Sequence, residues 1–190
     1  MSDVRSLIAG AALAAALAVP AQAQDLFADM KESCAACHGA DAADDVPALG
    51  GIDVYYALLQ LVAFRSNQRE NEVMNAMVAD FSNDDLRAAA DWVASLPHPD
   101  PPEDAADPTT IEAGAALADE NRCNSCHGAD YLGGHQMPPL RNQREGYILK
   151  SLHDYKASRR IGDRAAMVEI ATPLTDDEMT TLAVYLANLK

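Results

Sequence analysis

Positive charge is scarce in this chain of 190 residues, where 14 Lys and Arg stand against 29 Asp and Glu and give a formal net charge of −15 at pH 7. Nucleic acid and anionic lipid are bound largely by clustered basic side chains, so this balance argues against both kinds of partner. Long apolar runs are missing beyond the N-terminal segment, and no later stretch is apolar enough to cross a membrane. Sustained alternation of apolar and polar residues is also missing, which predicts little or no sheet.

Cysteine is limited to four residues, and all four stand in two copies of Cys-x-x-Cys-His, at 34–38 and 123–127. This pentapeptide is the attachment signal for c-type haem. Two thiols three positions apart can form thioethers with one porphyrin, and the adjacent histidine then binds the iron as an axial ligand. Zinc is the main alternative, but a closed zinc site needs four ligands and neither half has a further cysteine. We expect two covalent haem c groups held by Cys34, Cys37, His38, Cys123, Cys126 and His127, with no thiol left for a disulfide.

The N-terminal segment 1–23 is typical of a secretory signal peptide. Residues 7–19 form an almost unbroken Ala/Leu run, and Ala21-Gln22-Ala23 matches an A-x-A cleavage site. The run is shorter than the roughly 20 residues of a membrane span, although a retained anchor is the alternative. We expect a mature protein that begins near Gln24 and lies in the bacterial periplasm.

The rest of the chain is an internal duplication. Cys34 aligns with Cys123 at an offset of 89 residues, Tyr56 with Tyr147 at 91, and Trp92 with Tyr185 at 93. The increase of this offset along the chain requires small insertions in the second copy. The segment 97–104 is rich in proline, which predicts a semi-rigid linker. We therefore expect a first domain over 24–96, a linker over 97–108 and a second domain over 109–190.

Each copy is predicted to be helical, so the fold class is all-α. One helix should include the haem motif, over about 25–37 and 110–126, and a second should follow near 55–62 and 147–155. The last helix of each copy has the clearest start, because Ser82 to Asp85 and Thr175 to Glu178 match capping boxes or near variants.

Two haem motifs in two helical copies resemble a tandem of class I cytochrome c domains, as in the cytochrome c4 family, over essentially the whole mature chain. The resemblance implies that a methionine from the loop before the last helix is the sixth iron ligand. Met74 and Met167 stand seven residues before Phe81 and Leu174, in equivalent places, and are the residues that match.

Other residues compete for this role. Met77 lies close to Met74, although Ile170 occupies its equivalent position. In the second copy the alternatives are Met137, His135 and His153.

The resemblance also implies that a loop proline lies near each proximal histidine. Pro47 and Pro138 match, with Pro139 as a rival in the second copy. Their carbonyl oxygens could accept the histidine ring N–H and so tune the ligand. An ordinary turn proline is the alternative.

Histidine and methionine together leave no open iron position, so the resemblance implies an electron-transfer protein rather than an enzyme. Its partners would be redox proteins such as a dehydrogenase, a terminal oxidase or another cytochrome. The alternatives are a dedicated cytochrome subunit of a flavin, quinoprotein or molybdenum dehydrogenase, and a dihaem peroxidase. Basic residues before Met167 suggest a docking patch; they are Lys150, Lys156, Arg159, Arg160 and Arg164.

Overall fold

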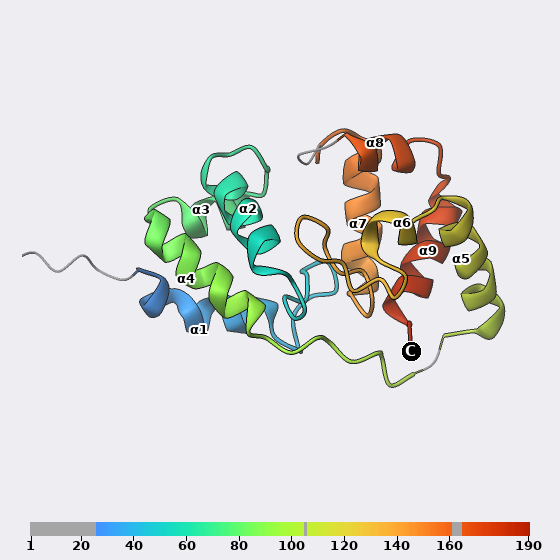
Figure 1. The fold of residues 1–190 in the computed structure, drawn as a ribbon, viewed down its shortest axis with the longest axis horizontal. Coiled ribbons are helices and arrows are strands. Elements are labelled where there is room, and N and C mark those ends of the chain that lie inside the picture. Colours follow the sequence, from blue (N-terminus) through green and yellow to red (C-terminus); the bar gives the residue numbers. More distant parts are fainter. Residues whose placement is uncertain (1–25, 105, 161–164) are drawn as a thin grey trace, which may run out of the picture.

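The computed structural model describes residues 26–104, 106–160 and 165–190. These residues form helices in two groups that lie side by side along the long axis of the molecule (Figure 1). They contain no strand, only an isolated bridge between Gly134 and Met137. The predicted all-α class is therefore confirmed. No helix among these residues has the length and apolarity that a membrane crossing requires.

The first repeat consists of α1 (Leu26–His38), α2 (Val54–Arg65), α3 (Glu72–Val78) and α4 (Asn83–Ala94). Its α4 begins at the predicted capping box, in which the Ser82 side chain accepts from the Asp85 amide and the Asp85 carboxylate accepts from the Ser82 amide. Asp85 also accepts from the Phe27 amide at 3.2 Å, so the start of α4 is joined to the start of α1. Around this junction lies an apolar core that contains Phe27, Phe64, Val78, Phe81, Leu86 and Ala89.

The second repeat consists of α5 (Pro108–Glu120), α6 (Asn124–His127), α7 (Glu145–Lys156), α8 (Ala166–Ala171) and α9 (Asp176–Ala187). Its α9 begins at the second predicted capping box, between Thr175 and Glu178. The helices α7 and α9 follow their counterparts α2 and α4 at offsets of 91 and 93 residues, as the sequence alignment predicts. A separate core is built from Ala118, Tyr131, Ile148, Leu152, Leu174, Met179, Leu182, Ala183, Leu186 and Ala187.

Two predictions about helix boundaries are wrong. The helix expected over 110–126 is interrupted after Glu120, because Arg122 takes the left-handed conformation with φ of 55° and the chain turns before α6. The methionine segments, expected to be loops, are the short helices α3 and α8. In α3 the Asn71 side chain accepts from the Met74 amide, which caps the helix just before the methionine.

The segment between α4 and α5 has no helix in its described residues, which run along the edge of the molecule in Figure 1. It is attached to both repeats. A Cβ added to Gly50 would lie 1.8 Å from the Pro97 carbonyl oxygen, so the first repeat can approach the segment this closely only with glycine. The Asn142 side chain of the second repeat donates to the Pro99 carbonyl oxygen at 3.2 Å.

Candidate haem sites

The two cysteines of each motif lie one helical turn apart, so both can face the same ligand. Cys34 and Cys37 belong to the last turns of α1, whereas Cys123 and Cys126 lie at the start and within α6. All four are free thiols; the first of each pair is half-buried and the second is exposed. Burial raises the pKa of Cys34 and of Cys123, so these two thiols stay protonated at neutral pH.

Each motif histidine is fixed by a proline carbonyl. The Nδ1 of His38 donates to the Pro47 oxygen at 2.8 Å, and the Nδ1 of His127 donates to the Pro138 oxygen at 2.8 Å. A carbonyl oxygen can only accept, so Nδ1 carries the proton and Nε2 is the nitrogen that can bind iron. Burial lowers the pKa of both imidazoles, which favours the neutral form that a metal ligand requires.

These observations fit haem c. Each site offers a free thiol pair and a neutral histidine held in one tautomer. The zinc alternative needs four ligands, and among the described residues no three His, Cys, Asp or Glu side chains are grouped to hold a metal ion.

The two methionines that compete for the first iron lie on the same short helix. Met74 and Met77 lie on α3, three residues apart, and both are half-buried against the core of the first repeat. The segment before them is held by Asn75, whose side chain donates to the carbonyl oxygens of Phe64 at 2.6 Å and Arg69 at 2.9 Å. The structure therefore brings α3 to the core, and both methionines stay available as ligands.

In the second repeat, Met167 on α8 packs against the same core cluster as Cys123 of the haem motif. Its competitors are placed less favourably. His135 is exposed, and Met137 belongs to the loop that directly follows the motif, where it pairs with Gly134. His153 on α7 faces the start of α9, with its Nδ1 3.9 Å from a carboxylate oxygen of Asp176.

A reciprocal arginine–tyrosine exchange joins the repeats. Arg69 of the first repeat donates to the Tyr147 hydroxyl at 2.9 Å, and Arg160 of the second donates to the Tyr56 hydroxyl at 3.0 Å. Both pairs align at the offset of 91, so the duplication extends to the contact between its copies. The sequence analysis aligned the tyrosines and assigned Arg160 to a docking patch, but it did not predict that the arginines bind the tyrosines. The offset of 91 shared by Arg69 and Arg160 is a signal that could have indicated this contact.

Burial and the two arginines act on the pKa of the tyrosine hydroxyls in opposite directions. Burial alone would raise the pKa of Tyr147, but Arg160 and Arg69 lower it to about 7. Burial raises the pKa of Tyr56 to about 12.

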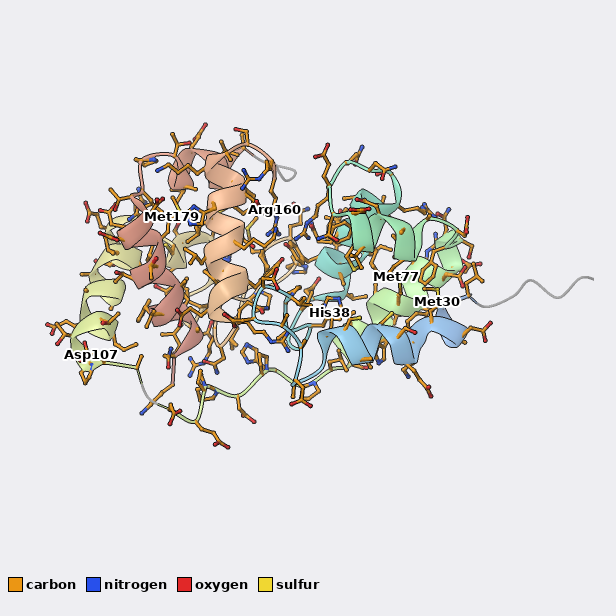
Figure 2. The ribbon with its side chains drawn as sticks, turned by 180° about the vertical axis from the view of Figure 1, so that it is seen from behind. Met30, His38, Met77, Asp107, Arg160 and Met179 are labelled. Atoms are coloured by element: carbon orange, nitrogen blue, oxygen red, sulfur yellow. The ribbon has the colours of Figure 1, made fainter. Side chains whose placement is uncertain are left out.

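The predicted basic docking patch is wrong for Arg160. This residue is half-buried and lies on the side of the second repeat that faces the first (Figure 2), where its guanidinium also stacks 4.8 Å from the Tyr155 ring centre. Lys150 and Arg159 both pair with Asp154, at 2.6 and 2.8 Å, and Lys156 donates to the Leu174 carbonyl oxygen. Arg164 lies outside the described residues.

Comparison with protein families gives a separate match for each repeat. Residues 111–190 match the family described as cytochrome c, and residues 20–93 match subunit III of cbb3-type cytochrome c oxidase.

Full-length relatives cover both repeats. The chain is 35% identical to a thiosulfate dehydrogenase electron acceptor of Stutzerimonas stutzeri over 83% of this chain and 79% of that protein. It is 29% identical to cytochrome c4 of Azotobacter vinelandii over 82% of this chain and 84% of that protein.

Solved structures give the same result. Reduced cytochrome c4 from Pseudomonas stutzeri superposes with a TM-score of 0.77 at 25% identity, over 87% of this chain and 97% of that chain. Thiosulfate dehydrogenase (TsdBA) from Marichromatium purpuratum superposes with a TM-score of 0.69 at 31% identity, over 81% of this chain and 36% of that larger chain.

These likenesses confirm the tandem cytochrome c architecture, covalent haem c as the cofactor, and electron transfer rather than catalysis as the role. The chain belongs to the dihaem c-type cytochromes of the cytochrome c4 type.

Proposed function

We propose that this chain is a periplasmic dihaem carrier that takes electrons from a dehydrogenase and passes them to an acceptor such as a terminal oxidase. The duplication of one haem site carries the proposal, because each repeat presents a thiol pair and a histidine anchored by a proline carbonyl. Two such sites in one chain provide capacity for two electrons.

The proposal assigns a role to each part of the chain. Segment 1–23 is a cleaved signal peptide, 24–96 and 109–190 are the two haem domains, and 97–108 is their linker. His38 with Met74 would hold the first iron and His127 with Met167 the second, and Pro47 and Pro138 would orient the histidines.

When bound, haem c supplies a one-electron Fe(III)/Fe(II) couple. Histidine and methionine side chains of the protein would complete the coordination of each iron, so that no position would be left for a substrate. A thioether ligand opposite histidine favours reduced iron and raises the reduction potential. This ligand set argues against a dihaem peroxidase, which needs a position that is open or readily opened.

The relatives support one class of donor. The electron acceptor of Stutzerimonas stutzeri is named for thiosulfate dehydrogenase, and we propose an enzyme that oxidises thiosulfate as the donor to this chain. A dedicated subunit in a stable complex is the second candidate, favoured by the likeness to part of the TsdBA chain.

The test is anaerobic stopped-flow mixing of the mature holoprotein with a purified thiosulfate dehydrogenase and thiosulfate. We expect the haem absorption to show the uptake of two electrons per chain. The rate of reduction should saturate with dehydrogenase concentration, and no reduction should occur when thiosulfate is omitted. Reduction no faster than with thiosulfate alone would refute the proposed donor. Size-exclusion chromatography of the mixture separates the candidates, since a dedicated subunit elutes with the enzyme and a free carrier does not.

A further inference from the structure

The loop that anchors His38 is held by the other repeat. Arg144, at the start of α7, donates to the Val46 carbonyl oxygen at 2.6 Å and to the Gly39 carbonyl oxygen. Gly39 follows His38 and Val46 precedes Pro47 in the chain, so one guanidinium joins the two ends of the loop that the His38–Pro47 hydrogen bond closes. In Figure 2, His38 lies toward the second repeat while Met30 lies nearer the far end of α1.

Two neighbours of Arg144 complete this contact. The buried side-chain amide of Gln143 accepts from the Ala48 amide and donates to the Ala48 carbonyl oxygen, both at 2.8 Å. The Gly146 amide donates to the Asp44 carboxylate at 2.7 Å. The start of α7 therefore fixes the loop on both sides of Pro47, and we call residues 143–146 the α7 clamp.

Arg144 breaks the usual rule for its position. It is the N-cap of α7, where a short polar side chain is preferred and a cation opposes the helix dipole, and its side chain makes no capping bond. The equivalent residue in the first repeat, Asp53, caps α2 by accepting from the Tyr55 amide. Arg144 is therefore unfavourable for its own helix, while its side chain makes hydrogen bonds to the other repeat. Such a conflict with the local preference indicates a functional position.

The residues of the clamp are not repeated in the first copy. At the offset of 91, Gln143 and Arg144 correspond to Ile52 and Asp53, which cannot make these bonds to the second repeat. The loop between His127 and Pro138 has backbone bonds of its own, from the Gly133 amide to the His127 carbonyl oxygen and between Gly134 and Met137. The two haem sites therefore differ although the repeats align.

We propose that Arg144 is a positioning residue through which the second repeat raises the reduction potential of the first haem, with Gln143 holding the Pro47 carbonyl in place. The half-buried Arg144 guanidinium donates to the carbonyl oxygen of Gly39, the residue that follows His38, so its positive charge lies close to the proximal ligand. A fixed cation beside the proximal ligand disfavours Fe(III), which carries one more positive charge than Fe(II). The inference rests on the proposed ligation by His38 but not on the donor, because potentials are measured without a partner.

The experiment compares the two potentials in wild-type holoprotein, Arg144→Gln and Arg144→Lys by spectroelectrochemistry, with haem-methyl NMR to follow each haem. A Met74→His variant identifies the resonances of the first haem. The matched control is Arg141→Gln, because the Arg141 side chain makes no hydrogen bond or ion pair with the described residues.

We expect Arg144→Gln to lower the potential of the first haem alone. The electron distribution between the haems should change at least threefold, which corresponds to about 28 mV for a one-electron couple at 59 mV per tenfold. Arg144→Lys should retain most of the effect of Arg144 on the potential of the first haem, and Arg141→Gln should leave both potentials unchanged. If Arg144→Gln leaves the potential of the first haem unchanged, or shifts both potentials equally, the proposal is wrong.

A second measurement keeps the proposal testable if Arg144→Gln folds poorly. Gln143→Ala retains the charge of Arg144 but removes both bonds to Ala48. We expect faster hydrogen exchange at the Ala48 amide and a shifted His38 Nδ1–H resonance, with His127 unchanged. If His38 and His127 both keep their wild-type resonances, the clamp does not position the first histidine.

Discussion

Replacing Gly114 by alanine should destabilise the second repeat, although alanine is the better helix former. Gly114 lies in α5 where this helix crosses α9, and it is buried. A Cβ at this position would lie 2.3 Å from the Tyr185 Cβ and 2.9 Å from the Thr181 carbonyl oxygen. The oxygen belongs to the backbone of α9, so the clash cannot be relieved by turning a side chain.

The size of the effect follows from two opposing contributions. Carbon atoms pack at about 3.5–4.0 Å, so the two helices must separate by about 1.2 Å or more at this point. Overpacking of this kind costs about 1–3 kcal/mol. The higher helix propensity of alanine returns about 1 kcal/mol. A carbon–carbon contact of 2.3 Å is severe, so the packing cost should lie in the upper part of that range, at about 2–3 kcal/mol. After the gain in propensity, the free energy of unfolding should fall by about 1–2 kcal/mol.

The assay is denaturant unfolding of the holoprotein, followed by far-UV circular dichroism and by haem absorption. The matched control is Ala113→Gly on the exposed face of the same helix, which should lose about 1 kcal/mol from propensity alone. If Gly114→Ala unfolds at the same or a higher denaturant concentration than wild type, α5 and α9 do not approach as closely as described.

Two further predictions concern the axial ligands and the helix junction of the first repeat. Met74→His and Met167→His should each keep the affected haem low-spin and lower the reduction potential of that haem alone, because the thioether favours reduced iron. Potentiometric titration measures both potentials. An unchanged potential would exclude the substituted residue as a ligand. Asp85→Asn should destabilise the first repeat by about 1 kcal/mol at pH 7, since hydrogen bonds to a charged acceptor are stronger than neutral ones. The hydrogen bond from Ser82 lowers the pKa of Asp85, so this stability is present above the unfolded pKa and is lost as the pH falls through the lower folded pKa. The wild type and the variant should therefore unfold alike in strong acid, and a difference that persists there would contradict the assignment.

Local signals in the sequence predicted much of the fold. The capping boxes at Ser82 and Thr175 each depend on residues within one helical turn, and both helices begin where the pattern indicates. The break before α6 carried no such signal, because Arg122 takes a left-handed conformation that sequence patterns associate with glycine or asparagine.

The contacts between the repeats were beyond sequence reasoning. Arg160 belongs to a basic stretch that is typical of solvated surface, and only the packing of the two repeats places it against Tyr56. Arg144 was detectable in principle as an unsuitable N-cap, but its partners Gly39 and Val46 lie about a hundred residues away. Short-range patterns cannot locate such partners, which depend on how the two copies pack.

The spin state of both irons in the oxidised, resting protein tests the central claim most directly. Absorption and electron paramagnetic resonance spectra should show two low-spin haems per chain, with a thioether-to-iron absorption band whose intensity corresponds to two methionine ligands. Met74→His and Met167→His should each remove half of that band. A high-spin haem in the resting wild type, or a band that neither substitution reduces, would contradict two closed histidine–methionine sites and the role of an electron carrier.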